Sequence, residues 1–167
     1  MTRSALLLAF VAAAGAAQAN LLSNGGFETN TWGGTSFLLV QPGDAVITDW
    51  AVGQTSVDIV GTDYSPYAGS FAVDLAGTPG PGSVSQGLTL TAQPYVISFF
   101  ARSTTSDPLN STISVDLGSF SSSVVATGQW QQYTLVATPG AGLSTFSLGT
   151  LPTNGTNGNL FVDNVSI

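Results

Sequence analysis

Residues 69–86, "GSFAVDLAGTPGPGSVSQ", carry the pattern that decides the fold class. Phe71, Val73 and Leu75 fall at every second position, with smaller or polar residues between them. This period of two is typical of a β-strand with one buried face. The glycine- and proline-rich middle of the stretch predicts a turn, and the alternation after it predicts a second strand. The stretch is therefore expected to form two strands joined by a turn.

Short segments of the same kind recur along the chain, and no helical periodicity appears after residue 19. Turn residues separate the segments, and no linker or internal repeat divides them. This series predicts an all-β fold, an antiparallel β-sandwich of the jelly-roll kind, in a single domain over residues 20–167. The predicted strands are residues 45–50, 56–60, 70–75, 83–90, 95–102, 112–117, 131–137, 144–148 and 160–167.

The first nineteen residues have the three-part plan of a secretory signal peptide. Arg3 supplies a positive charge, residues 5–14 form a short apolar run, and residues 17–19 read Ala-Gln-Ala, an A-x-A cleavage site. A membrane anchor is the alternative, but crossing a bilayer takes roughly 20 apolar residues and this run is shorter. We expect residues 1–19 to be removed, and the mature protein to be extracellular or at the cell surface without membrane insertion.

The composition excludes several classes of function. The chain has no cysteine and no histidine, and its two basic residues are arginines. Removal of the signal peptide would leave Arg102 as the only basic side chain against nine acidic ones, so nucleic-acid binding is not expected. The missing residue types also remove the usual general base, the thiol nucleophile and the Schiff-base amine.

One catalytic chemistry remains open to this composition, that of a glycosidase with two carboxylates about 5–10 Å apart. Asp58 together with Asp74 or Asp116 would be the candidate pair. Nothing in the sequence marks an acid among these aspartates. We therefore predict that the protein is not an enzyme.

An ordered series of motifs resembles a known family. Together they resemble the secreted domain of unknown function found in plant cell-wall proteins and in the bacterial surface proteins called choice-of-anchor C. More broadly the chain is similar to the galactose-binding-like jelly rolls, which include many carbohydrate-binding modules. The motifs are "LLSNGGFE" at 21–28, "SVDIV" at 56–60, the stretch at 69–86, "PYVISFFAR" at 94–102, "WQQYTLVAT" at 130–138 and "LFVDNVSI" at 160–167.

The resemblance implies a structural Ca²⁺ ion where the first and last strands of the domain lie side by side. Its ligands would map to Glu28, the only glutamate in the chain, and to Asp163. Ser70 begins a strand that could add another oxygen. Calcium takes about six to eight hard oxygen ligands, so glycine-rich backbone at residues 24–26 could contribute carbonyls. The alternative is that Glu28 caps a turn and Asp163 is a solvated strand residue.

Loop aromatics and strand acids are the candidates for ligand binding. Tyr64 and Tyr67 bracket a Ser-Pro pair, and Trp32 lies beside two glycines. Sugar sites stack the apolar face of a pyranose on such rings, and nearby acids or amides bind its hydroxyls. Asp58 and Asp74 alternate with apolar neighbours and could supply those bonds. The alternative for each aromatic is packing within its own loop.

Other aromatic and charged residues have plainer interpretations. Trp50, Trp130 and Tyr133 are predicted to pack in the core. Arg102 is expected to pair with Asp107 or Asp116, and recognition of an acidic sugar by its guanidinium is the alternative.

These features predict a secreted, non-catalytic module that binds a polysaccharide of a cell wall or extracellular matrix and holds structural calcium. The alternative is a surface or biofilm protein that associates with copies of itself, because many β-strands and few charges favour pairing between strand edges.

Overall fold

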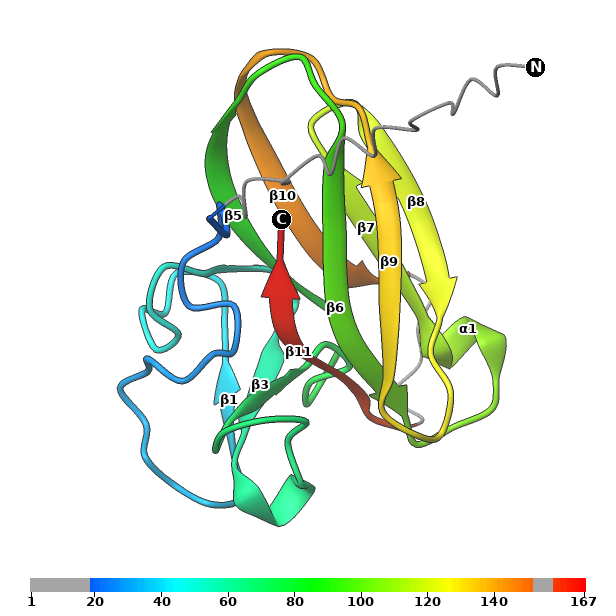
Figure 1. Cartoon of the computed structure of the whole chain (residues 1–167). Coiled ribbons are helices and arrows are strands. Elements are labelled where there is room, and N and C mark those ends of the chain that lie inside the picture. The colour runs from blue at the N-terminus through cyan, green and yellow to red at the C-terminus, as the bar shows by residue number, and fades with distance from the viewer. Residues whose placement is uncertain (1–18, 152–157) are drawn as a thin grey trace, which may run out of the picture.

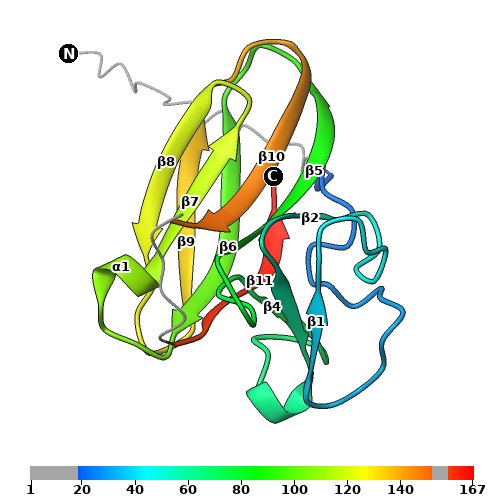
Figure 2. The same cartoon turned by 180° about the vertical axis from the view of Figure 1, so that it is seen from behind.

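The protein is described by a computed structural model that covers residues 19–151 and 158–167. Two antiparallel sheets pack face to face, as Figures 1 and 2 show from opposite sides. The sheet nearer the viewer in Figure 1 has the strand order β1-β3-β4-β11-β6-β9, and the other has the order β2-β5-β10-β7-β8. The predicted all-β sandwich is confirmed. The predicted signal peptide lies outside the described residues except for Ala19.

The six-stranded sheet consists of β1 (Phe37–Val40), β3 (Val57–Val60), β4 (Ala72–Asp74), β6 (Tyr95–Ser103), β9 (Gln131–Ala137) and β11 (Leu160–Ser166). The five-stranded sheet consists of β2 (Ala51–Gln54), β5 (Gly82–Leu90), β7 (Thr112–Leu117), β8 (Phe120–Val125) and β10 (Gly142–Thr150). A 3₁₀ turn, η1 (Thr62–Tyr64), and a single helical turn, α1 (Pro108–Ser111), lie in the loops. Within the described part of the chain, no helix is both long and apolar enough to cross a membrane.

Most predicted strands are present, but one was misplaced, and two strands and a helical turn were missed. Residues 45–50 do not form a strand, because Asp49 adopts a left-handed backbone conformation with φ of 67° and β2 begins only at Ala51. The sequence analysis predicted neither β1 nor the serine-rich β8. It also missed α1, where the Asp107 side chain accepts the Leu109 N–H at 3.0 Å and Pro108 occupies the first helical turn.

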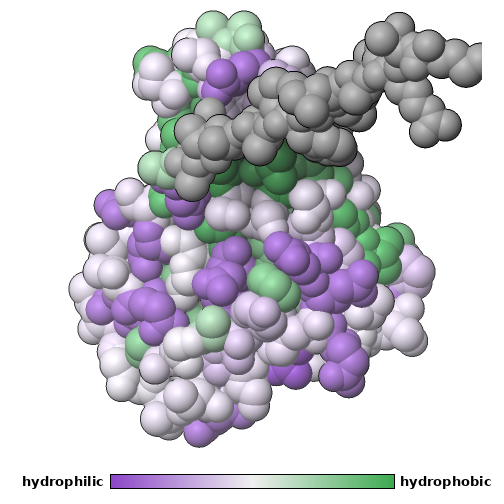
Figure 3. Space-filling view, in the orientation of Figure 1, coloured by the Kyte–Doolittle hydropathy of each residue, from purple (hydrophilic) through white to green (hydrophobic). Residues whose placement is uncertain are grey.

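The outer face of the six-stranded sheet is where the candidate sites lie. In β6 the residues Val96, Ser98, Phe100 and Arg102 point outward, while the residues between them are buried. The loop of residues 61–71, between β3 and β4, packs against part of this face through aromatic contacts. Figure 3 views the molecule from this side and shows polar and apolar side chains intermixed on its surface.

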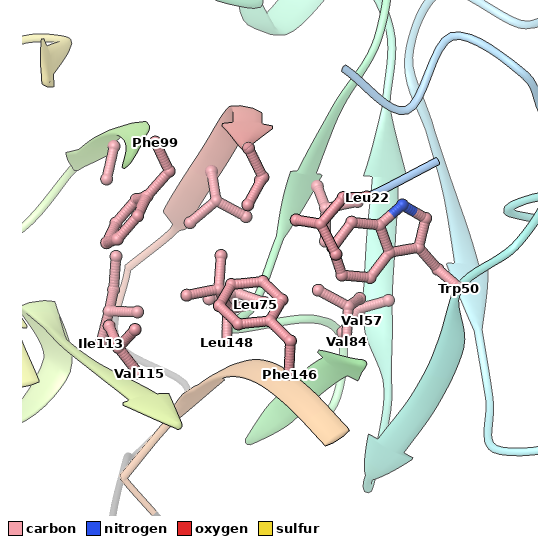
Figure 4. Packing of buried hydrophobic residues seen from close by; sticks show 14 of the residues in the cluster. Leu22, Trp50, Val57, Leu75, Val84, Phe99, Ile113, Val115, Phe146 and Leu148 are labelled. Atoms are coloured by element: carbon pink, nitrogen blue, oxygen red, sulfur yellow. The ribbon is translucent and has the colours of Figure 1, made fainter. Parts of the chain in front are cut away.

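The core lies between the two sheets and is filled by aliphatic and aromatic side chains (Figure 4). Trp50 is buried at one end, packs against Phe27 and Phe146, and donates its indole N–H to the Asn24 carbonyl at 2.9 Å. The prediction that Trp50 is a core residue is therefore confirmed. Tyr133 is half-buried and stacks on Phe99, with ring centroids 5.7 Å apart.

Candidate functional site

The opening segment of the described chain lies directly beside its last strand. The Leu21 N–H donates to the Ile167 carbonyl at 3.0 Å, and the Val165 N–H donates to the Gly25 carbonyl at 2.9 Å. The Asn20 side chain adds two bonds, to the Val165 carbonyl and from the Ile167 N–H. We call this junction of residues 20–28 with β11 the terminal seam. The opening segment thus lies beside the last strand as the resemblance implied, but residues 20–28 form no strand, and the first strand, β1, pairs with β3.

The terminal seam brings the two predicted metal ligands to the same place. A Cβ atom on Gly26 would lie 3.7 Å from Glu28 Cγ and 3.9 Å from Asp163 Oδ1. Asp163 is fully buried on the outward side of β11, and burial raises the pKa of its carboxyl to about 6. The negative charge of Glu28 raises the pKa further, while hydrogen bonds from the Ala68 and Asn164 N–H groups lower it.

Both carboxylates hold the loop of residues 67–71. Glu28 accepts the Ser70 N–H at 2.9 and 3.1 Å on its two oxygens and the Phe71 N–H at 3.0 Å. Asp163 accepts the Ala68 N–H at 3.0 Å. These bonds agree with the alternative interpretation of Glu28, in which its side chain caps a turn. Ser70 meets Glu28 through its backbone N–H.

The donor set of the terminal seam is chemically suited to calcium. Carboxylate oxygens are hard ligands, and each has two lone pairs. Glu28 Oε2 accepts one N–H and keeps one lone pair. Asp163 accepts the N–H groups of Ala68, Asn164 and Tyr67 and keeps one lone pair of its four. The described residues contain no group of three or more Asp, Glu, His or Cys side chains arranged to hold a metal. An ion between Glu28 and Asp163 would therefore need backbone carbonyls or water to complete its coordination. The residues fit a calcium site of that kind.

Tyr67 forms an exposed aromatic surface on the same side of the molecule. Its ring lies over that of Phe100, with centroids 3.5 Å apart and an interplanar angle of 12°. Trp130 packs edge-on against Tyr67 at 6.1 Å and donates its indole N–H to the Ser65 carbonyl at 3.0 Å. Tyr67 nevertheless remains 42% exposed. We call the Tyr67–Phe100 pair the aromatic platform.

A shallow pocket of about 360 Å³ adjoins the aromatic platform at Phe100 and the terminal seam at Gly26. Its walls carry amides and hydroxyls and no charged side chain. The Gln132 amide donates to Ser98 Oγ at 2.8 Å, which orients two of these groups. We call it the amide pocket; it is lined by Asn20, Gly25, Gly26, Ser98, Phe100, Gln132, Asn164, Val165 and Ser166.

The other two predicted aromatics are less available than Tyr67. Tyr64 is half-buried between Phe37 and Phe161, at centroid distances of 6.3 and 5.9 Å. Trp32 is half-buried against Phe71 at 6.0 Å. Both rings are used for packing, as the alternative expected, but against residues outside their own loops.

Asp58 and Asp74, predicted to bind sugar hydroxyls, face each other across β3 and β4 and are both buried. Asp58 accepts the N–H and hydroxyl of Thr78. Asp74 accepts the N–H groups of Ala76 and Leu160 and the Asn159 amide, and it borders a small opening of about 150 Å³. Burial raises the pKa of both carboxyls, that of Asp74 to about 6. Their bonds hold loops, and Asp116 lies on β7 in the other sheet.

Arg102 has a different environment from the one predicted. Its guanidinium lies 4.6 Å from the Phe161 ring centroid and 5.3 Å from that of Trp130, and it donates to the Tyr64 carbonyl. Burial lowers the pKa of this guanidinium, and the charge of Asp74 acts in the opposite direction. The predicted partners were wrong, since Asp107 caps α1 and Asp116 belongs to the other sheet. Trp130, expected in the core, lies in this outer cluster.

Two larger openings, of about 710 and 570 Å³, lie over the five-stranded sheet and meet at Gly87. We call them together the second groove. Leu143, 91% exposed, borders one part, and Asp44 and Asp49 border the other. Trp50 is the one aromatic residue in its lining, and that side chain is buried.

Sequence comparison finds little. No protein-family model matches the chain. One curated relative, halomucin from Haloquadratum walsbyi (strain DSM 16790 / HBSQ001), is 35% identical over 85 residues, which are 49% of this chain and 1% of that protein. The matched part is therefore a very small fraction of that relative's length.

Solved structures show the fold. A structure of TmCBM61 in complex with β-1,4-galactotriose has a TM-score of 0.59 at 19% identity and covers 89% of this chain and 97% of that one. A CBM4 structure has a TM-score of 0.50 at 19% identity and covers 86% and 96%. The chain therefore has the two-sheet antiparallel sandwich architecture of the carbohydrate-binding-module jelly rolls.

Proposed function

We propose that this protein is a non-catalytic module that binds a polysaccharide of a cell wall or extracellular matrix at the aromatic platform and the amide pocket. One observation carries the proposal: an exposed tyrosine, supported from below by Phe100, stands beside a pocket of uncharged amides and hydroxyls. A sugar ring offers an apolar C–H face to an aromatic ring and hydroxyls to amides. The similar architecture of carbohydrate-binding modules supports the same class of ligand.

The proposal includes a structural calcium ion held by Glu28 and Asp163, with the Ser70 backbone as a third ligand. When bound, the ion would offset the mutual repulsion of two neighbouring carboxylates, one of them buried. The residues themselves join three segments: Glu28 from the opening segment, Asp163 from β11 and the loop of residues 67–71 that carries Tyr67. The position of the aromatic platform therefore depends on the terminal seam.

Secretion, and membership of the choice-of-anchor C and plant cell-wall family, belong to the same proposal. The pattern of residues 1–19 and the ordered motifs support them. A glycan-binding module of this kind would act outside the cell, where such polysaccharides occur.

The test is binding to a panel of purified polysaccharides, including β-1,4-galactan, a β-glucan and a xylan, measured with native protein and with Tyr67→Ala. Stacking on a ring is worth about 0.5–1.5 kcal/mol beyond area burial, so with the lost contact area we expect at least about a tenfold loss of affinity. Leu143→Ala in the second groove is the matched control and should bind like the native protein. If Leu143→Ala loses affinity for the polysaccharide while Tyr67→Ala keeps it, the binding site lies in the second groove. No binding to any polysaccharide would reject the function.

Self-association is the second candidate function. Val96 and Val136 are 56% and 64% exposed and lie directly opposite each other on β6 and the edge strand β9. Contacts between copies of a β protein often form at an edge strand with exposed apolar side chains. Sedimentation over a hundredfold range of concentration distinguishes the two: a protein that stays monomeric, while still binding glycan, would exclude this alternative.

A further inference from the structure

We infer that the amide pocket selects uncharged polysaccharides and excludes those that carry uronic acids or sulfate groups. The inference rests on the proposed function and specifies its substrate class. It is drawn from the charges around the pocket.

The lining of the amide pocket is suited to hydroxyl groups. Gln132 and Asn164 each offer an amide N–H and a carbonyl oxygen. Asn20 offers an N–H, because its carbonyl oxygen already accepts the Leu22 and Ile167 N–H groups. Ser98 and Ser166 each add a hydroxyl. A sugar hydroxyl both donates and accepts, so it can pair with the donors and with the acceptors of this lining. A sugar carboxylate or sulfate only accepts, so it would use the donors and leave the acceptor oxygens without partners.

Negative charge lies directly behind this lining. Gly26 forms part of the pocket wall, and a Cβ atom there would be within 4 Å of both Glu28 and Asp163 side-chain atoms. Asn164, another wall residue, donates its N–H to Asp163 Oδ1 at 2.6 Å. An anionic sugar in the pocket would therefore approach two carboxylates. Like charges brought together in this way strongly oppose binding.

No basic side chain of the described residues is available to reverse this field. Arg102 is the single lysine or arginine within residues 19–151 and 158–167. Its guanidinium is enclosed by Phe161 and Trp130, bonded to the Tyr64 carbonyl and influenced by Asp74. A calcium ion at the terminal seam would cancel the two carboxylate charges without leaving an excess of positive charge. The pocket is thus neutral or negative in either state.

The experiment compares the same neutral panel with polygalacturonate, at low and at high salt. At low salt we expect the best neutral polysaccharide to bind at least about tenfold more tightly than polygalacturonate, since like-charge contacts cost several kcal/mol. Salt should narrow that difference, because it screens repulsion at this exposed pocket.

A second test uses a variant that should gain binding, since a gain of binding cannot result from a failure to fold. Gln132 is exposed on the edge strand β9 and lines the pocket. Gln132→Arg should gain binding to polygalacturonate. Ser121→Arg places the same charge on the outward side of β8 in the other sheet and should not.

The outcomes separate the two proposals. Equal binding of neutral and acidic polymers by the native protein would overturn the charge selection and leave glycan binding intact. Equal gains in Gln132→Arg and Ser121→Arg would also overturn it, because the effect would then come from overall charge. If no polysaccharide binds, the proposed function fails and this inference fails with it.

Discussion

The carboxylate of Glu28 accepts the backbone N–H of Ser70 on both of its oxygens, at 2.9 and 3.1 Å, although the two residues are 42 positions apart in sequence. The only glutamate of the chain is therefore used to join the opening segment to the loop of residues 67–71. That loop carries the exposed ring of Tyr67. A substitution of Glu28 should consequently lower the stability of the fold and also disturb the position of the aromatic platform.

Replacement of Glu28 by alanine should destabilise the fold, because the N–H groups of Ser70 and Phe71 lose their acceptor. The bonds are exposed and water can replace them, so we expect about 1 kcal/mol, or a fall in Tm of about 2–4 °C. Thermal unfolding measures it. Glu28→Gln keeps one carbonyl oxygen and should lose less. Asp116→Asn, on the other sheet, is the control for removal of one charge; an equal loss there would contradict the assignment.

Gly25→Ala should disrupt the terminal seam, because the new Cβ would overlap the Val165 carbonyl oxygen. Overpacking of this kind costs about 1–3 kcal/mol, and a clash with backbone has little room to relax. Gly140 is the matched control, since a Cβ there meets no atom within 4 Å. Urea unfolding should show a lower midpoint for Gly25→Ala alone. A normal midpoint for Gly25→Ala would mean that the seam is not closed in solution.

Calcium should raise the Tm of the native protein. A ligand that binds only the folded state at about 100 times its Kd stabilises by about 2.7 kcal/mol. Asp163→Asn removes one of the two carboxylates and should abolish most of this rise, while Asp116→Asn should keep it. Scanning calorimetry with and without chelator makes the comparison. A rise that persists in Asp163→Asn would place the ion elsewhere.

Stability should depend on pH through Asp74. Burial and the charge of Asp58 raise its pKa from 3.8 to about 6, against the effect of its hydrogen bonds. The folded state therefore holds a proton that the unfolded state has released, and stability from this group, present below about pH 4, is lost as the pH rises through 6. Two pKa units correspond to on the order of 3 kcal/mol.

The measurement for this prediction is the free energy of unfolding at pH 5 and pH 7.5, with chelator present so that metal binding at the seam does not contribute. Asp74→Asn should reduce the difference between the two pH values and leave the part that Asp163 contributes, because burial also raises the pKa of that carboxyl to about 6. The variant keeps Oδ1, which accepts the N–H groups of both Ala76 and Leu160, so folding should survive the loss of the Oδ2 acceptor for the Asn159 amide. A pH dependence unchanged in Asp74→Asn would assign it to another carboxyl group.

The sequence predicted the sheets better than the surface. Alternation identified the strand at residues 131–137 with its correct bounds, because period-two burial leaves a direct mark in the residues. It could not show that Asp49 bends the chain out of a strand, since the left-handed conformation comes from its tertiary setting. The serines of β8 lie on an edge strand, where few apolar residues are needed.

For the candidate site, the sequence supplied Tyr67, Glu28 and Asp163 but missed Phe100 and Gln132. Phe100 stands in a nearly all-apolar strand, so its outward direction was hidden among buried neighbours. Which loop lies over that outward face depends on the return of the chain from β3 to β4. No local pattern specifies that path.

The Leu21 nitrogen and the Ile167 carbonyl oxygen lie 3.0 Å apart, so residues 21 and 167 are in direct contact. A few added residues could therefore close the backbone into a ring, and the exposed turn at Gly140 could be opened to give a circular permutant. For the same reason the whole unit could be inserted into a surface loop of a host protein without stretching it.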